Sequence, residues 1–257
     1  MQSKILNMER KYAIYLPPCY ETSERSYPVL YLLHGGGDDQ TGWIQFGEVL
    51  RITDKAIQEG KATPMIIVMP NANTGKRGYL NDVKGNWRYE DFFFEELMPY
   101  VEKKFRIKSE KRYRAISGMS MGGQGTYVYA LHRPDLFSSA CPISGGMEPL
   151  SIEEMEGFVK KWGETGTNEE IRKWYENRSP LFMIEHMPEE QKKEIHWYID
   201  CGDDDYKYEG NSLAHIAMRK NNIPHEYRVR DGAHSWTYWR ESLPEVLNFV
   251  SKHFHQL

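Results

Sequence analysis

One short segment of the chain carries a serine in a setting that can make it a nucleophile. Residues 118–122 read GMSMG; they directly follow the apolar run Tyr113–Ile116 and directly precede an amphipathic segment. This G-x-S-x-G pattern is typical of a tight, strained turn between a strand and a helix, with the serine at its apex. Glycine is needed on both sides of the serine because a Cβ there would collide with neighbouring chain. The pattern therefore predicts that Ser120 is a catalytic nucleophile.

Two segments resemble phosphate-binding loops without meeting the sequence requirements of such loops. Gly118-x-Ser120-x-x-Gly123 has the spacing of a dinucleotide fingerprint, but its middle glycine is replaced. The acidic residue expected about 20 residues further on is also missing. Residues 73–76 read NTGK, but Pro70 stands where the first glycine of a phosphate loop belongs. We expect no nucleotide site at either segment.

A serine hydroxyl needs a base to remove its proton and a carboxylate to hold that base in the right tautomer. Nine histidines could supply the base. His234 lies in a glycine-containing loop that follows the last strand-like run, Tyr227–Val229. The other histidines precede the acid candidates or lie in helical segments, at a strand start or near the C-terminus. A loop histidine at the end of a strand can reach a serine on the same sheet edge, so His234 is the predicted base.

The acid candidates follow the strand-like run Ile195–Ile199. Four carboxylates lie there: Asp200, Asp203, Asp204 and Asp205. Gly202 lets the chain leave the strand, which allows Asp205 to project back toward the histidine loop. Asp203 and Asp204 then read as solvated loop charges, and Asp200 as part of the strand. Spacing favours Asp205 only modestly and leaves the other three open.

The oxyanion of an acyl-transfer intermediate needs two backbone N–H groups. One comes from the residue after the nucleophile, which is Met121. The second comes from an early loop, and residues 34–37, which read HGGG after the apolar run Val29–Leu33, have the form used for this purpose. We predict Gly36 as that donor. A merely flexible glycine turn is the alternative.

These groups need a scaffold that brings strand ends together. Seven short β-branched or aromatic runs recur along the chain and are mostly continuously apolar, which is typical of strands covered on both faces: Tyr12–Leu16, Val29–Leu33, Met65–Met69, Tyr113–Ile116, Ala140–Ile143, Ile195–Ile199 and Tyr227–Val229. Amphipathic segments alternate with them, so we expect an α/β three-layer sandwich around a mostly parallel sheet. No linker divides residues 1–257, which predicts a single domain. Residues 147–194 contain no strand-like run and are predicted to be a helical insertion, or lid, over the active-site edge.

Composition narrows the possible partners. The 33 Lys and Arg residues against 37 Asp and Glu residues give a net charge of −4, so we expect no nucleic-acid partner. No run approaches the roughly 18 apolar residues of a membrane-spanning helix. Three widely spaced cysteines suggest neither a disulfide framework nor a zinc site. The N-terminus has no secretory signal, which leaves the compartment open between the cytoplasm and export with the leader already removed. Oligomeric state is not predictable from these features.

Several motifs in one order support a family resemblance. They are Leu16-Pro17-Pro18, YLLHGG at 31–36, GMSMGG at 118–123, CGDDD at 201–205 and GAHSW at 232–236. From about Arg10 to the end, the chain resembles the esterase D-like serine esterases, and most of all the feruloyl esterase modules of bacterial xylanases in the first carbohydrate-esterase family. Cys19 stands where that family usually has glycine, and the 147–194 insertion is longer than in the xylanase modules.

The resemblance implies an α/β-hydrolase fold with Ser120, Asp205 and His234 as the triad and with Gly36 and Met121 as oxyanion donors. It implies no metal and no organic cofactor. The expected substrate is a small-molecule or oligosaccharide ester, hydrolysed through an acyl-enzyme, such as ferulate bound to plant cell-wall polysaccharide. Alternatives are an acetyl or short-chain carboxylesterase, an S-formylglutathione hydrolase, an acyltransferase or a noncatalytic binding protein.

Aromatic residues near the motif loops are candidates for binding a planar ring or a sugar. We predict Trp43, Trp87 and Trp236 as substrate-binding residues; Tyr89, Tyr238 and Trp239 lie in the same segments. Packing in the core is the alternative for each of them, because large aromatic side chains are readily buried whatever their function.

Overall fold

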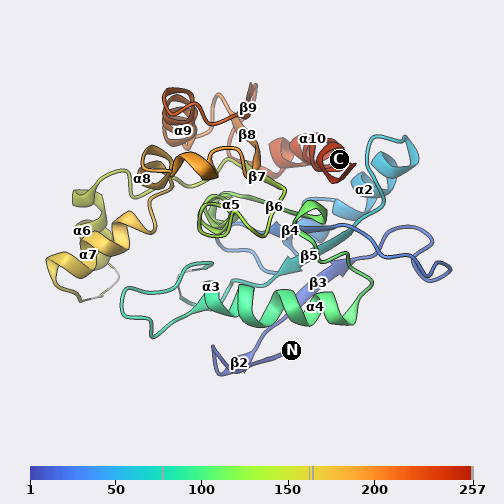
Figure 1. The fold of residues 1–257 in the computed structure, drawn as a ribbon, viewed down its shortest axis with the longest axis horizontal. Helices are drawn as coiled ribbons and strands as arrows, with labels where there is room; N and C mark the ends of the chain where they lie inside the picture. The colour runs from blue at the N-terminus through green and yellow to red at the C-terminus, as the bar shows by residue number, and fades with distance from the viewer. Residues whose placement is uncertain (77, 162, 164, 256–257) are drawn as a thin grey trace.

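A computed structural model describes residues 1–257 except 77, 162, 164 and 256–257. Its central feature is a seven-stranded sheet with the order β3-β5-β4-β6-β7-β8-β9 (Figure 1). β3 pairs antiparallel with β5, and every other neighbouring pair is parallel. The strands are β3 (Tyr12–Tyr15), β4 (Val29–Leu33), β5 (Ile66–Pro70), β6 (Arg114–Met119), β7 (Ser139–Ile143), β8 (His196–Gly202) and β9 (His225–Arg230). A separate two-stranded hairpin pairs β1 (Gln2–Ser3) with β2 (Met8–Glu9).

Helices cover both faces of the sheet. α2 (Val49–Gln58) and α10 (Trp236–His255) pack on one face. On the other lie α3 (Tyr89–Asp91), a π-helical segment (Phe92–Leu97), α4 (Met98–Lys104), α5 (Met121–His132), α8 (Pro180–Glu185) and α9 (Tyr208–Lys220). The remaining helices are α1 (Gly42–Gln45), α6 (Ile152–Lys161), α7 (Asn168–Glu176) and 3₁₀ turns at Lys111–Tyr113 and Glu189–Gln191.

The continuous apolar character of the strands follows from this layering. All five residues of β4 are buried. Val29, Tyr31 and Leu33 join the core under α4 and α5, whereas Leu30 and Leu32 join the core under α2 and α10. Successive side chains of a strand point to opposite faces, so a strand covered on both sides must be apolar at every position.

The predicted fold class is confirmed: the described chain forms an α/β sandwich around a mostly parallel sheet. The interval 147–194 contains α6, α7, α8 and a 3₁₀ turn, and its own small core includes Met155, Val159 and Trp174. α2 lies between the predicted strand-like runs Val29–Leu33 and Met65–Met69, and α10 begins at Trp236, the last residue of the GAHSW motif. No helix within the described residues is both long and apolar enough to cross a bilayer.

Candidate active site

Ser120 sits in a left-handed turn between β6 and α5. Its backbone φ is 56° and its ψ is −117°, a conformation that L-residues rarely adopt. A Cβ on Gly118 would lie 2.6 Å from the Gly122 carbonyl oxygen, and a Cβ on Gly122 would lie 2.5 Å from the Leu33 carbonyl oxygen. The glycines therefore let the elbow press against β4 and leave the serine at the apex.

The structure brings Ser120, His234 and Asp205 together at the C-terminal edge of the sheet. His234 Nε2 lies 2.9 Å from Ser120 Oγ, and His234 Nδ1 lies 2.9 Å from each carboxylate oxygen of Asp205. A carboxylate can only accept, so Nδ1 carries the hydrogen and Nε2 is left to accept the serine proton. The three side chains come from the β6–α5, β8–α9 and β9–α10 connections.

Asp205 is buried, and its surroundings keep it ionised. Burial raises the pKa of this carboxyl, but hydrogen bonds from His234, Ser144 and the Lys207 backbone outweigh burial and hold the pKa below its usual range. The Lys207 N–H donates to Asp205 Oδ1 at 2.8 Å. A charged Asp205 can therefore orient His234 and stabilise the imidazolium that forms during reaction.

The other three acid candidates lie elsewhere. Asp200 is buried within β8, where it accepts from Tyr238, from Arg230 at 2.5 Å and from Tyr198 at 3.3 Å. Burial raises the pKa of Asp200. Asp203 and Asp204 are exposed, and with Asp231 they bring carboxylate oxygens within 4.8 Å of one another. Exposed acidic groups of this kind are common without a metal, so we assign no metal site to them.

Gly36 and Met121, the predicted oxyanion donors, lie on two segments that contact each other beside Ser120. Met121 is the first residue of α5, where N–H groups have no acceptor within the helix. Gly36 is exposed, and a Cβ added there would meet no atom within 4 Å. Because a Gly122 Cβ would touch both the Leu33 and His34 carbonyl oxygens, the elbow and the loop at 34–37 are in direct contact.

His34 holds the glycine loop in position. Its Nδ1 lies 2.8 Å from the Gly35 carbonyl oxygen, and its Nε2 accepts the Ala72 N–H at 2.9 Å. Burial lowers the pKa of His34, which favours the neutral ring that this pattern requires, with the hydrogen on Nδ1. The His34 N–H also donates to Tyr79 Oη at 2.8 Å. The sequence motifs did not predict that His34 would hold this loop in position.

The three predicted substrate-binding tryptophans occupy different environments. Trp43 is 0% exposed and donates its indole N–H to the Leu33 carbonyl at 3.0 Å, so it has no surface with which to contact a ligand in this structure. Trp87 is half-buried and packs against the core on the α4 and α5 side of the sheet. Trp236 is half-buried and packs edge-on against Trp43 and Trp239 with centroids 5.2 Å apart in each pair.

Three further residues lie beside the triad, and of these only Trp239 was among the aromatic residues noted in the sequence. Tyr206 is exposed, and its ring centroid lies 4.4 Å from that of His234. Trp239 is buried and meets the same imidazole edge-on at 5.0 Å. The Trp239 indole N–H donates to Ser144 Oγ at 3.0 Å. His234 is thus held between two aromatic rings.

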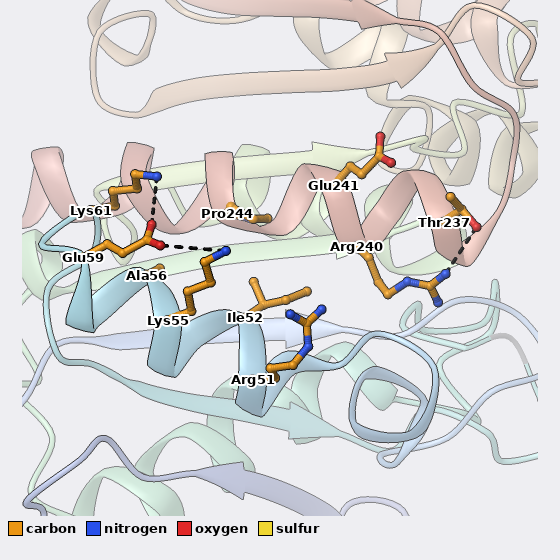
Figure 2. A pocket seen from close by; sticks show the side chains of 10 residues that line it. All are labelled: Arg51, Ile52, Lys55, Ala56, Glu59, Lys61, Thr237, Arg240, Glu241 and Pro244. Carbon is orange, nitrogen blue, oxygen red and sulfur yellow. Dashed lines mark hydrogen bonds and ion pairs between the residues drawn. The ribbon is translucent and has the colours of Figure 1, made fainter.

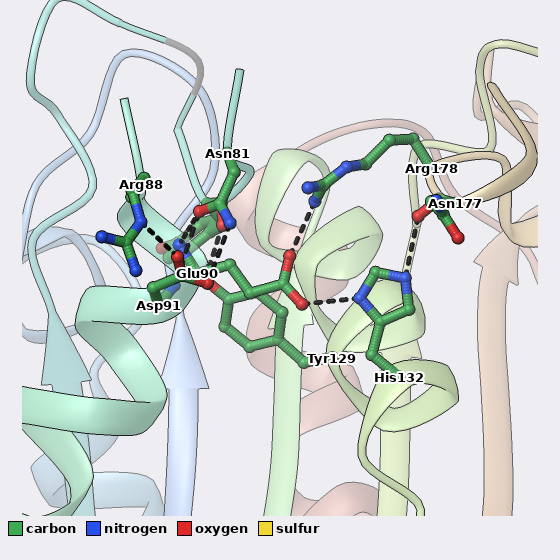
Figure 3. Close-up of polar contacts among 9 residues, drawn as sticks. Asn81, Arg88, Glu90, Asp91, Tyr129, His132, Asn177 and Arg178 are labelled. Carbon is green, nitrogen blue, oxygen red and sulfur yellow. Dashed lines mark hydrogen bonds and ion pairs between the residues drawn. The ribbon is translucent and has the colours of Figure 1, made fainter. Parts of the chain in front are cut away.

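A buried ion cluster joins the 147–194 segment to the body of the protein (Figure 3). Glu90 Oε1 lies 2.6 Å from His132 Nδ1, and Glu90 Oε2 accepts from Arg178 Nη1 at 2.7 Å. His132 Nε2 lies 2.8 Å from the Asn177 carbonyl oxygen. Both ring nitrogens of His132 therefore face oxygen atoms of other segments. α3, α5 and the end of α7 meet at this cluster.

Two cavities in the described part of the chain lie outside the triad. One, of about 310 Å³, is lined by residues that include Gln124, Met155 and Lys207. Gln124 lies one helical turn after Ser120 and its N–H donates to the Ser120 carbonyl at 3.0 Å, but no triad residue lines this cavity. The other, of about 520 Å³, lies between α2 and α10 and is lined largely by charged side chains such as Lys55, Glu59 and Arg240 (Figure 2). No triad residue lines the second cavity.

Comparisons with known proteins agree with this geometry. The family described as "Putative esterase" matches residues 3–250. An endo-1,4-beta-xylanase/feruloyl esterase of Xylanibacter ruminicola is 30% identical over 254 residues, which cover 93% of this chain but only 29% of that protein. A solved ferulic acid esterase structure is 35% identical with a TM-score of 0.85, covering 98% of this chain and 96% of its own. An S-formylglutathione hydrolase of Staphylococcus aureus shares the fold at 21% identity and a TM-score of 0.78, with coverage of 98% and 96%.

Proposed function

Because this chain belongs to the esterase family that matches residues 3–250, we propose that it is a serine carboxylic-ester hydrolase that releases a hydroxycinnamate such as ferulate from plant cell-wall polysaccharide. The observation that carries the reaction type is the Ser120–His234–Asp205 arrangement, with 2.9 Å between His234 Nε2 and Ser120 Oγ. The similarity to a xylanase/feruloyl esterase and to a ferulic acid esterase supports the substrate class.

The mechanism follows from the positions of the protons. Ser120 Oγ attacks the ester carbonyl carbon while His234 Nε2 takes the hydroxyl proton. The carbonyl oxygen becomes an oxyanion, which the N–H groups of Gly36 and Met121 stabilise. The C–O bond to the alcohol then breaks as His234 returns the proton to the leaving oxygen, and the acyl group stays on Ser120. A water activated by His234 hydrolyses this acyl-enzyme and restores the serine.

The test of the reaction type uses a serine replacement. Ser120→Ala should lower kcat/KM on methyl ferulate by at least about 10⁴-fold, because the nucleophile itself is removed. Ser109→Ala, at an exposed serine outside the site, should retain wild-type kcat/KM. A fluorophosphonate probe should label the wild type and Ser109→Ala, and should fail to label Ser120→Ala. Retained turnover or retained labelling in Ser120→Ala would overturn the assignment.

The substrate class is tested with a panel of esters. Methyl ferulate and a feruloylated xylo-oligosaccharide should give higher kcat/KM than an aryl acetate or S-formylglutathione. A preference for the acetate would favour a short-chain carboxylesterase, and a preference for the thioester would favour an S-formylglutathione hydrolase. Transfer of the acyl group to an added alcohol in place of water would indicate an acyltransferase.

A further inference from the structure

We infer that the exposed ring of Tyr206 forms a saccharide subsite on the alcohol side of the active site, where the sugar of the ester substrate stacks while its bond to the acyl group is cleaved. This inference rests on the proposed function, since it assigns the leaving alcohol of that reaction. Tyr206 directly follows Asp205 in the β8–α9 connection and is 67% exposed.

The first support is the position of Tyr206 beside the catalytic base. The Tyr206 and His234 ring centroids lie 4.4 Å apart, with 45° between the ring planes. The other ring on this imidazole, Trp239, is only 6% exposed and uses its indole N–H inside the protein. Of the two rings on His234, Tyr206 therefore offers the free aromatic surface.

The second support comes from the path of the proton. His234 Nε2 must deliver a proton to the oxygen of the departing alcohol, so this oxygen lies at hydrogen-bond distance from Nε2 during cleavage. The first sugar ring is bonded to that oxygen, directly or through one carbon. It must therefore lie close to His234, whose ring centroid is 4.4 Å from that of the exposed Tyr206. A sugar has an apolar C–H face that can lie on an aromatic ring while its hydroxyl groups stay in water.

The third support is that the segment carrying Tyr206 is held in place. The Lys207 N–H donates to Asp205 Oδ1 at 2.8 Å, and the Tyr208 N–H donates to the Asp205 carbonyl at 2.8 Å. The Lys207 ammonium lies 5.1 Å from the Tyr206 ring centroid and 2.7 Å from Glu148 Oε1. Lys207, the one cation over this ring among the described residues, is thus already paired with Glu148, so it offers no unpaired positive charge to an acidic sugar.

The experiment compares two esters of one acyl group. kcat and KM are measured for methyl ferulate and for a feruloylated neutral xylo-oligosaccharide, with the wild type, Tyr206→Ala, Tyr206→Phe and the control Tyr208→Ala. Tyr208 is 56% exposed and lies two residues further on. Tyr206→Ala should raise KM for the saccharide ester about 3- to 10-fold relative to KM for methyl ferulate, which is the range expected for one aromatic contact. Tyr206→Phe should keep the wild-type ratio, because the ring face is retained, and Tyr208→Ala should keep it as well.

A binding measurement separates the subsite from catalysis. Calorimetric titration with the unesterified xylo-oligosaccharide should show weaker binding to Tyr206→Ala than to the wild type, whether or not the protein hydrolyses ferulate. Equal binding to both would overturn the subsite. An equal loss of kcat on both esters in Tyr206→Ala, with no change in the KM ratio, would also overturn it and assign Tyr206 to positioning His234. Absence of hydrolysis by the wild type, with the binding difference intact, would overturn the proposed function alone.

Discussion

Arg178 Nη1 donates a hydrogen bond to Glu90 Oε2 at 2.7 Å and so joins the end of α7 to α3 across 88 positions of the chain. Both side chains are buried, with 9% and 8% exposed. Asp91, next to Glu90, accepts from Arg88 and Asn81, which holds this short helix in place (Figure 3). The segment that carries α6 and α7 and lines part of the cavity next to Gln124 is therefore fixed to the body by a charge pair that water hardly reaches.

Removing the cation of this pair should be costly. We expect Arg178→Met to lower the free energy of unfolding by about 3 kcal/mol, because it leaves a buried carboxylate with one partner fewer. The matched control is Arg133→Met, which breaks the exposed pair with Asp135 and should change stability by less than about 1 kcal/mol. Urea unfolding at neutral pH measures both. Equal losses of unfolding free energy in the two variants would show that the buried pair contributes no more to stability than the exposed pair.

The same cluster should make stability depend on pH. Burial raises the pKa of Glu90, but the hydrogen bonds and charges of His132 and Arg178 outweigh it and hold the pKa below its usual range. A carboxyl whose pKa is lower in the folded state stabilises the fold above its unfolded pKa, and this stabilisation is lost as the pH falls through the folded pKa. Glu90→Gln should therefore destabilise the protein at pH 7, and its deficit relative to wild type should shrink on acidification. A deficit that stays constant with pH would contradict this.

Removal of the Asp205 charge should impair catalysis without unfolding the protein. Asp205→Asn can no longer hold His234 in the tautomer that accepts from Ser120, so we expect kcat to fall by about 10³- to 10⁴-fold. Asp204→Asn, at the exposed neighbouring carboxyl, should stay within about threefold of wild type. Initial rates on methyl ferulate give the comparison, and circular dichroism confirms that both variants are folded. Comparable activity in the two variants would exclude Asp205 as the acid.

The contact between elbow and glycine loop predicts a contrast between two glycine replacements. Gly122→Ala would place a Cβ 2.5 Å from the Leu33 carbonyl oxygen and force the loop carrying Gly36 away from Met121. We expect a lower Tm and a fall in kcat of about 10²-fold or more, since one oxyanion donor is displaced. Gly157→Ala, in α6 with no atom within 4 Å of the new Cβ, should be neutral or slightly stabilising. A harmless Gly122→Ala would disprove the close packing.

Thiol reactivity should distinguish the cysteines. Burial raises the pKa of the Cys201 thiol to about 12 and raises that of Cys141 as well, whereas Cys19 is exposed. Iodoacetamide at pH 8 should modify one site in the folded protein and three after denaturation, because the thiolate is the reactive form. Mass spectrometry of the intact chain counts the adducts. Rapid modification of Cys141 or Cys201 in the folded state would show that the strands open locally.

The sheet was predictable because its strands are buried on both faces. Val29–Leu33 appears in the structure with the predicted bounds, since five apolar residues between charged and glycine-rich segments have few alternatives. β6 extends to Met119, beyond the end of the predicted run Tyr113–Ile116. This extension includes Gly118, and a glycine has no side chain that could contribute to an apolar pattern. α2 alternates charged and apolar residues over a short length, and its packing against α10 is a long-range contact that local patterns do not contain.

Site residues were predictable only where a motif fixes the backbone. The triad residues and Gly36 lie in turns whose chemistry shows in the sequence, and the structure brings the triad within hydrogen-bond distance. Their catalytic roles stay predictions. The presence of an aromatic residue does not predict whether its ring is buried or exposed. Trp43 is fully buried, whereas Tyr206, which belongs to no motif, is exposed beside His234.

The anchoring of α6 and α7 has a consequence for how relatives of this protein can diverge. The proton-transfer groups lie on connections that follow β6, β8 and β9, whereas the helices after Pro149 meet the body partly through Glu90 and His132. A chimaera that takes these helices from another member of the family could acquire a new range of esters without disturbing the reacting atoms. The graft needs to keep at least a guanidinium and a carbonyl oxygen facing the same acceptor and donor.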